Sequence, residues 1–236
     1  MALPKLNNAP KYELTIPSSG ETVRYRPFLV KEEKNLMIAA ESKDNKTIFR
    51  SLVDTIMTCI DDKVDDKKLT SFDIEYMFLQ LRSKSVGESS KIGLRCSECQ
   101  VGNEITVRLD DIKIDMPDVN KMIKLTDDIT VEVDWPTFND LINSEVTQTE
   151  NPTTAQAFKL ICSCLKTIHT EEERINLSDV TDEELQEFLD SMSSGQFDLI
   201  KSFIDQIPKL EHEVEFTCKS CNHENKLIIE GVSNFL

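Results

Sequence analysis

Four of the seven cysteines form two Cys-x-x-Cys pairs, Cys96/Cys99 and Cys218/Cys221. A Cys-x-x-Cys turn can bring two thiolates to one Zn²⁺ at about 2.3 Å, and two such turns complete a tetrahedral site with four sulfur ligands. The spacing inside each pair suits zinc, although residues 100–217 make a gap far longer than that of a compact zinc ribbon. We therefore predict one structural zinc per chain, shared by these four cysteines, with a fold that brings the two turns together.

Three other interpretations of the same cysteines stay open. Either His212 or His223 could replace one of the sulfur ligands. Cys-x-x-Cys is also a redox motif, although that chemistry favours a single pair at a helix N-terminus in an electropositive site. Finally, the pairs could descend from a metal site that has lost its metal.

The remaining cysteines, Cys59, Cys162 and Cys164, fall within apolar helical patterns. Residues two apart point to different sides of a helix, so Cys162 and Cys164 cannot pair there. Free cysteine is among the most buried residue types and behaves as a small hydrophobic side chain. We expect that role for all three.

No catalytic constellation accompanies the cysteines. The three histidines lie in no recognisable motif, and the sequence has neither a Gly-rich phosphate loop nor a Gly-x-Ser-x-Gly elbow. The acidic clusters at 61–66 and 171–173 lack the glycine-containing spacing of an EF-hand calcium loop, and we expect them to be solvated loops. The sequence therefore predicts a protein without catalytic residues.

The surroundings of the two cysteine pairs predict a β-hairpin around each. Apolar residues alternate with polar ones before and after each pair, and an asparagine follows each second cysteine by four residues, at Asn103 and Asn225. Such period-two alternation around a tight turn is typical of a hairpin. The alternating apolar positions are Ile92, Leu94, Ile105 and Val107 in the first copy, and Val214, Phe216, Leu227 and Ile229 in the second.

The same order of elements, strand, helix, helix and hairpin, is predicted twice, over 11–112 and 122–231. The first copy has Phe49, Leu52, Ile56 and Cys59 at helical spacing, and the second has Phe158, Ile161, Leu165 and Ile168. We interpret this as an internal duplication whose two lobes pack about a pseudo-two-fold axis, so that the hairpin tips meet at the shared zinc.

We therefore predict a mixed α+β fold with two similar lobes joined by a zinc-ribbon-like site. The first domain is expected over 1–118, with the N-terminal zinc hairpin, and the second over 119–236, with the C-terminal zinc hairpin. Their natural joint is Asp115–Asp118. The second lobe carries an extra helix, which begins at the capping box Thr181–Glu184.

Composition indicates a globular protein and disfavours a membrane-spanning or secreted one. The chain has 236 residues, of which 39% are hydrophobic and 30% charged, as in globular proteins. No apolar run approaches the ~20 residues that span a bilayer, and the first residues lack the apolar core of a signal peptide. We therefore expect a reducing cytoplasm, in which the cysteines are free thiols or metal ligands.

The net charge is −16, from 27 Lys and Arg against 43 Asp and Glu. Nucleic-acid binding depends mostly on Lys and Arg that neutralise phosphates, so this balance disfavours it. Residues 1–118 carry a net −2 and residues 119–236 a net −14. The acidic second half either provides solubility or faces a basic partner, through Glu171–Glu173 and Asp182–Glu187.

The segment Tyr25–Lys34, followed about sixty residues later by a Cys-x-x-Cys hairpin, resembles the baseplate hub and hub-assembly protein family of phage T4-like contractile tails. The chain length and the closing segment Ile229–Val232 agree with that family. The resemblance implies a non-enzymatic protein that helps to build the central hub of a tail baseplate. It also implies other baseplate or hub proteins as partners and the paired cysteines as metal ligands. The locations that it implies are the host cytoplasm during assembly and, for a member that stays in the particle, the virion tail baseplate.

Two other functions compete with this one. A zinc-ribbon adaptor acting on host transcription or nucleic acid would use the same cysteines, but the acidic balance disfavours it. A thiol-redox enzyme would need a cysteine with a low pKa and turnover in disulfide exchange. No membrane or nucleic-acid partner is expected for the baseplate protein.

Overall fold

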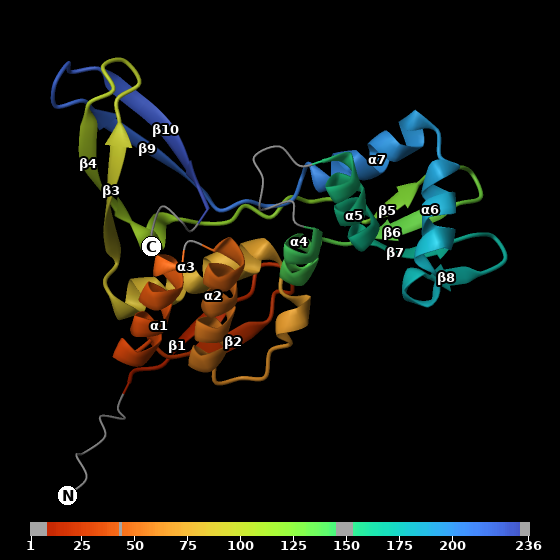
Figure 1. Cartoon of the computed structure of the whole chain (residues 1–236), viewed down its shortest axis with the longest axis horizontal. Helices are drawn as coiled ribbons and strands as arrows, with labels where there is room; N and C mark the ends of the chain where they lie inside the picture. Colours follow the sequence, from red (N-terminus) through yellow and green to blue (C-terminus); the bar gives the residue numbers. More distant parts are fainter. Residues whose placement is uncertain (1–8, 43, 145–152, 232–236) are drawn as a thin grey trace, which may run out of the picture. The chain divides into compact units, whose positions relative to one another are not determined.

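A computed structural model describes residues 9–42, 44–144 and 153–231. The chain has a mixed α+β fold (Figure 1), which confirms that part of the predicted fold class. It forms two compact units: unit 1 comprises Met1–Asp115 with Lys209–Leu236, and unit 2 comprises Met116–Pro208. The units therefore do not coincide with the predicted halves 1–118 and 119–236, because the second hairpin belongs to unit 1. The internal duplication stays a prediction.

Unit 1 combines a helical part with three antiparallel strand pairs, β1–β2, β3–β4 and β9–β10. Its helices are α1 (Val30–Glu41), α2 (Asn45–Cys59) and α3 (Ser71–Ser85), and its strands are β1 (Tyr12–Thr15), β2 (Thr22–Tyr25), β3 (Ser89–Arg95), β4 (Gly102–Arg108), β9 (Glu211–Thr217) and β10 (Glu224–Glu230).

A buried carboxylate fixes the start of α3 and attaches it to the β1–β2 turn. Thr70 is the N-cap and forms a capping box with Asp73. The Asp73 carboxylate also accepts hydrogen bonds from the backbone N–H of Ser18 at 2.9 Å and from its hydroxyl at 2.6 Å. Asp73 is fully buried. Since a buried carboxylate is stable only with hydrogen-bond partners, this network ties two segments that are far apart in sequence.

The two long hairpins, β3–β4 and β9–β10, lie next to each other (Figure 1). One hydrophobic cluster joins the two hairpins to α3. Buried and more exposed residues alternate along β3, β4 and β9 and along residues 224–229 of β10, so that only one face is buried. The cluster contains Leu79, Ile92, Val107, Leu109, Ile112, Leu210, Val214 and Ile229. This shared core explains why the second hairpin belongs to unit 1 although it follows unit 2 in the sequence.

Unit 2 is built on a four-stranded antiparallel sheet in the order β5-β6-β7-β8. Capping boxes start α5, α6 and α7, and the one predicted at Thr181–Glu184 is confirmed at α6. The elements of unit 2 are β5 (Met122–Lys124), β6 (Thr130–Val133), α4 (Phe138–Ser144), α5 (Thr154–Cys164), β7 (Leu165–His169), β8 (Arg174–Asn176), α6 (Asp182–Asp190) and α7 (Ser194–Ile204).

One helix of the predicted second lobe is shorter than expected. Leu165 and Ile168 were assigned to a helix, and this was wrong, because α5 ends at Cys164 and both residues lie on β7. Ile168 pairs with Val131 of the neighbouring strand β6. The spacing was misleading because α5 runs directly into β7. Apolar residues of the helix and of the following strand can then fall three or four apart in the sequence although they do not share one helix face.

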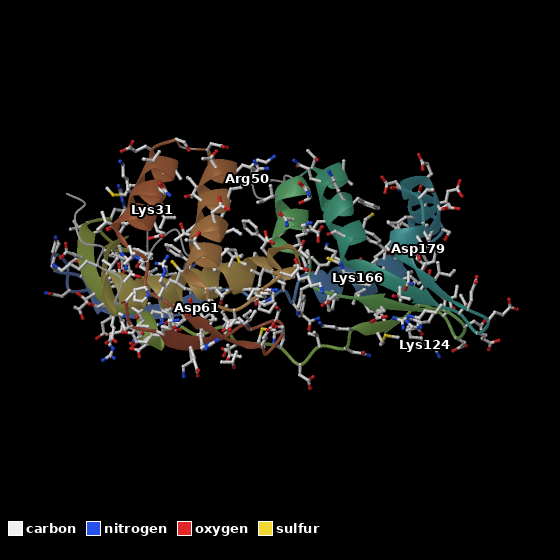
Figure 2. The ribbon with its side chains drawn as sticks, turned by 90° about the horizontal axis from the view of Figure 1, so that it is seen from below. Lys31, Arg50, Asp61, Lys124, Lys166 and Asp179 are labelled. Carbon is white, nitrogen blue, oxygen red and sulfur yellow. The ribbon has the colours of Figure 1, made fainter. Side chains whose placement is uncertain are left out.

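The acidic clusters lie at the surface, as predicted for solvated loops. Glu171, Glu172 and Glu173 are exposed between β7 and β8. In unit 1, Asp61 forms an ion pair with Lys11 at 2.8 Å (Figure 2 labels Asp61). Within the described residues, no helix is long and apolar enough to cross a membrane.

Candidate metal centre

The two hairpins end in turns of the same geometry. In the first turn, the N–H of Cys96 bonds to the carbonyl of Val101 at 3.1 Å, and the N–H of Gln100 bonds to the carbonyl of Cys96 at 3.0 Å. The second turn repeats both bonds, from Cys218 to His223 at 2.9 Å and from Asn222 to Cys218 at 3.0 Å.

The residue after the second cysteine of each turn is left-handed. Gln100 and Asn222 both have φ of 59°, and they are the only non-glycine residues with positive φ among those described. Such a conformation is uncommon outside glycine, although asparagine tolerates it better than most residues. A left-handed residue at this point reverses the chain directly after the second sulfur, so both cysteines of a pair face the same side of the turn.

The turns meet, and the structure brings the four predicted cysteines together. Their sulfur atoms all lie within 4.8 Å of one another. Between the hairpins, the Sγ atoms of Cys96 and Cys221 are 3.7 Å apart, and those of Cys99 and Cys218 are 3.6 Å apart. Zinc–sulfur bonds of about 2.3 Å in a tetrahedron place the sulfurs about 3.8 Å apart. The observed spacing therefore fits one tetrahedral ion held by four sulfurs.

Each hairpin also donates a hydrogen bond to a sulfur of the other. The amide nitrogen of Asn103 lies 3.7 Å from Cys218 Sγ, and that of Asn225 lies 3.6 Å from Cys96 Sγ. Both asparagines are buried. Donors around a metal-binding sulfur orient it and stabilise its negative charge. The two amides thus suit a cluster of thiolates better than a cluster of neutral thiols.

The carbonyl oxygens of the same two amides hold the opposite turn. Asn225 Oδ1 accepts from the backbone N–H of Ser97 at 2.9 Å, and Asn103 Oδ1 accepts from the backbone N–H of Lys219 at 2.9 Å. Each asparagine therefore bonds to both a sulfur and a backbone amide of the other hairpin. The contacts are reciprocal, as in a pair of elements related by a local two-fold axis.

Backbone donors in the turns favour the charged form of the first cysteine of each pair. The N–H groups of Cys221 and Ser220 lower the pKa of Cys218 to about 6. The N–H of Cys99 is the largest cause of the lowered pKa of Cys96. A thiolate is the form that binds a metal, so these backbone donors favour the form that a metal would require.

The opposite holds for Cys221. The N–H of His223 lowers the pKa of Cys221, but the nearby sulfurs of Cys99 and Cys96, together with burial, outweigh it and raise this pKa to about 12. Neighbouring sulfurs cannot all be negative without a counter-charge. A bound divalent cation supplies that charge and deprotonates coordinating thiols. The donor set therefore fits a divalent metal.

Neither His212 nor His223 belongs to the group of ligand atoms that the described residues bring together. Of the other cysteines, Cys59 and Cys164 are fully buried, as expected, and burial raises the pKa of Cys59 to about 11 and that of Cys164 to about 12. Cys162 is only half-buried, so the expectation for this residue was too strong.

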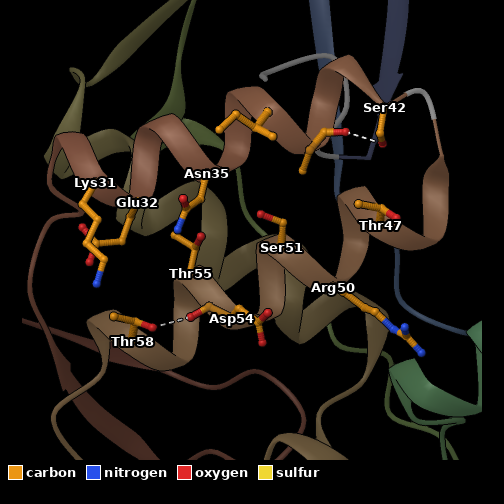
Figure 3. A pocket seen from close by; sticks show the side chains of 12 residues that line it. Lys31, Glu32, Asn35, Ser42, Thr47, Arg50, Ser51, Asp54, Thr55 and Thr58 are labelled. Atoms are coloured by element: carbon orange, nitrogen blue, oxygen red, sulfur yellow. Dashed lines mark hydrogen bonds between the residues drawn. The ribbon is translucent and has the colours of Figure 1, made fainter.

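A polar hollow of about 610 Å³ lies between α1 and α2 (Figure 3). Its charged side chains do not converge, since Lys31 lies at one end and Arg50 points away at the other (Figure 3). The Thr58 hydroxyl is bonded to the carbonyl of Asp54 in its own helix at 2.7 Å. We assign no chemistry to this hollow.

Sequence reasoning found the four sulfurs but not the role of the asparagines. Asn103 and Asn225 were noticed only as a repeated position, four residues after the second cysteine of each pair. That repetition was the available signal, because an amide kept at the same offset in two hairpins indicates a shared contact. Ser97 and Lys219 contribute backbone N–H groups, which no sequence pattern marks.

Comparisons with known proteins agree with the resemblance seen in the sequence. No solved structure matches the chain. A protein described as "Baseplate hub assembly protein gp26", from Enterobacteria phage T4, is 21% identical over 225 residues, which cover 95% of this chain and 97% of that protein. The family model described as "T4 bacteriophage base plate protein" matches residues 9–236. Because that match covers nearly the whole sequence, the chain belongs to the T4 bacteriophage base plate protein family.

Proposed function

We propose that this protein is a non-enzymatic assembly or structural protein of the baseplate hub of a contractile phage tail. The observation that carries the proposal is the near full-length similarity to a protein named for baseplate hub assembly. The absence of a catalytic motif in the sequence supports it. In this role the protein binds other baseplate or hub proteins, in the host cytoplasm during assembly and in the tail baseplate if it is retained there.

The proposal includes one structural Zn²⁺ per chain, with Cys96, Cys99, Cys218 and Cys221 as ligands. The sulfur spacing, the lowered pKa of two of the cysteines and the two amide donors support this assignment. The ion would join the tips of the two hairpins. Because a metal bound only by the folded state stabilises that state, this joint would contribute directly to the stability of unit 1.

We also propose that the two hairpins descend from one ancestral hairpin by duplication. The repeated turn bonds, the matched φ values of Gln100 and Asn222 and the reciprocal contacts of Asn103 and Asn225 support this relation. A tip exchange tests it. Replacing Cys96–Val101 by the sequence of Cys218–His223 should preserve metal binding, and loss of the metal in the folded variant would contradict the proposed equivalence.

The function is tested by complementation in the phage from which the chain comes. A phage lacking this protein should produce incomplete hubs, and the wild-type chain supplied in trans should restore complete baseplates, as judged by electron microscopy and sedimentation. Normal baseplates without the protein would overturn the proposal. Mass spectrometry of purified virions then decides whether the protein is retained in the tail.

The zinc is tested separately by elemental analysis of protein purified without added metal. We expect close to one zinc per chain. Two metals per chain would indicate that the hairpins act separately, and none would remove zinc from the proposal without affecting the role in hub assembly.

A further inference from the structure

The negative charge of the chain is concentrated in unit 2. Residues Met116–Pro208 contain six Lys and Arg against nineteen Asp and Glu, whereas unit 1 contains 21 against 24. On α6, Asp182, Glu183, Glu187 and Asp190 are all exposed. Like charges at this density repel one another, and a basic partner would relieve that repulsion.

A groove of about 790 Å³ runs between α5 and α6. Its lining contains the apolar side chains of Ala155, Phe158, Cys162 and Leu185. Phe158, Cys162 and Leu185 are half-buried, so apolar surface is open to the groove. The Phe158 ring also stacks on Phe197 of α7, with ring centroids 5.0 Å apart.

The rim of this groove is acidic. Asp182 and Asp190 line it, from the first and the last turn of α6. Among the described residues neither aspartate forms an ion pair, and Asp190 only accepts a hydrogen bond from Gln186 at 2.9 Å. The one cation that lines the groove, Lys159, donates to the backbone carbonyl of Asn143 at 2.8 Å. The rim therefore presents carboxylates that described cations leave unpaired.

We infer that the α5–α6 groove docks a basic amphipathic helix of another baseplate component. Apolar side chains of that helix would fill the groove over Phe158 and Leu185, and its flanking Lys or Arg residues would meet Asp182 and Asp190. An amphipathic helix laid in an apolar groove is a recurrent mode of peptide recognition. The inference rests on the proposed function for the identity of the partner, but the groove itself can be tested without it.

The dimensions suit a short helix. Helices α5 and α6 have 11 and 9 residues. At 1.5 Å per residue, the shorter helix, α6, is about 13.5 Å long, which corresponds to about two and a half turns of a docked helix. Nucleic acid is a poor occupant, because its phosphates would face the carboxylates of Asp182 and Asp190 along the α6 wall of the groove.

A designed peptide provides the probe. It has about 14 residues, with leucines along one helical face and lysines on the others. A scrambled peptide of the same composition has the same charge but no apolar face. Fluorescence anisotropy should show that the amphipathic peptide binds the full-length, metal-loaded protein at least about tenfold more tightly than the scrambled one, and that binding weakens as salt is raised. Equal binding of the two peptides would overturn the inference.

Two matched pairs of substitutions locate the site. Asp182→Asn with Asp190→Asn removes the charges that line the groove, and Glu183→Gln with Glu187→Gln removes as many charges from the same helix away from it. We expect the first pair of substitutions to weaken peptide binding about tenfold, because it removes two exposed ion pairs with the peptide. The second pair should weaken binding by less than about twofold. Equal losses in the two pairs would show that only net charge matters, which also overturns the inference.

A substitution among the apolar residues that line the groove tests its apolar character separately from its charge. Leu185→Gln is suitable, because it changes no charge. It should weaken the amphipathic peptide about tenfold and leave the scrambled peptide unaffected. Equal melting temperatures of the variants and the wild type would show that the helices remain folded. A folded Leu185→Gln variant with unchanged binding would contradict an apolar docking groove.

Complementation separates this inference from the proposed function. If the wild-type chain fails to restore baseplates, the proposed function is wrong. If the wild-type chain and both charge pairs restore them equally, the function stands and the groove inference is wrong. Restoration by the Glu183→Gln, Glu187→Gln pair but not by the Asp182→Asn, Asp190→Asn pair supports both.

Discussion

Units 1 and 2 contain the same kinds of element but stabilise their strands differently. In unit 2, four strands share one sheet, and Val131 and Val133 of β6 are fully or nearly fully buried. In unit 1, the strands form separate pairs, and the two long hairpins bury only one face each. A two-stranded hairpin is marginally stable by itself. We therefore expect contacts at the hairpin tips to matter more for the stability of unit 1 than any single contact does for the sheet of unit 2.

The units also differ in where they keep their charges. Unit 1 is nearly balanced in sign, and among its described residues it buries two hydrogen-bonded carboxylates, those of Glu32 and Asp73. Unit 2 is strongly acidic, and the carboxylates of α6 are exposed. Charge in unit 1 therefore contributes to structure, and the surplus charge in unit 2 is available to a partner. Substitutions in the two units should have correspondingly different effects.

The largest effect is expected at the sulfur cluster. If the proposed zinc is bound, Cys96→Ser or Cys218→Ser should lower the free energy of unfolding by about 4 kcal/mol or more, because loss of a structural metal is among the most destabilising changes. Cys162→Ser in unit 2 is the matched control and should cost less than about 1 kcal/mol, since Cys162 is half-buried and lies outside the cluster. Urea unfolding measures all three.

Removal of the proposed metal tests the same difference between units 1 and 2 without a mutation. A chelator should increase amide hydrogen exchange in β3–β4 and β9–β10 and leave the β6–β7 pair of unit 2 unchanged. Equal loss of protection in both units would mean that the metal stabilises the whole chain rather than the hairpins.

The next largest effect is expected at the N-terminus of α3, the helix on which the two long hairpins pack. Asp73→Ala should cost about 3 kcal/mol, because Asp73 accepts bonds from both Ser18 and Thr70 and its loss leaves buried donors unsatisfied. In unit 2, Asp140 accepts only from the backbone and hydroxyl of Thr137. Asp140→Ala should therefore cost about 1 kcal/mol, as for the loss of a helix cap. Equal costs, measured by urea unfolding, would contradict this difference.

Removing one of the amides should weaken the metal site more than the fold. Asn103→Ala or Asn225→Ala removes a donor to a sulfur and should lower zinc affinity about 10- to 100-fold, as is typical of groups that orient metal ligands. Competition with a coloured chelator measures this affinity. Asn139 is exposed, and Asn139→Ala is the control, which should leave zinc affinity unchanged. The Asn103→Ala and Asn225→Ala variants should lose similar amounts of affinity, because the contacts of the two asparagines are reciprocal.

The sequence predicted which four cysteines lie together and where the hairpins form, because short-range patterns specify both. Cysteine spacing and period-two alternation depend on a few adjacent residues, and both hairpins form where they were expected, around Cys96 and Cys218. The α6 helix was predicted for the same reason, from the capping box that begins at Thr181.

Other features depend on contacts between distant segments, which no local pattern reveals. The division into units was not predicted, because the β9–β10 hairpin joins unit 1 through Leu79 and Ile92, more than a hundred residues earlier in the chain. The end of α5 was missed because Leu165 and Ile168 satisfy helical spacing while pairing in a strand. The α5–α6 groove likewise depends on two helices that β7 and β8 separate in the sequence.

The smallest effect concerns Glu75, where unit 1 places a carboxyl group in surroundings that disfavour its charge. Burial raises the pKa of Glu75 to about 7, whereas an unfolded chain has a value of about 4.3. A raised carboxyl pKa means that the protonated form stabilises the fold. That contribution is complete below about pH 4 and is lost as the pH rises through 7.

Glu75→Gln should therefore stabilise unit 1 at pH 8 and be neutral at pH 4. The gain at pH 8 should be only about 1 kcal/mol, because solvent reaches part of the side chain and screens its charge. In unit 2, Glu183→Gln is the exposed control and should change stability little at either pH. Urea unfolding at both pH values measures the difference, and a gain at pH 4 equal to that at pH 8 would show that packing, not charge, is responsible.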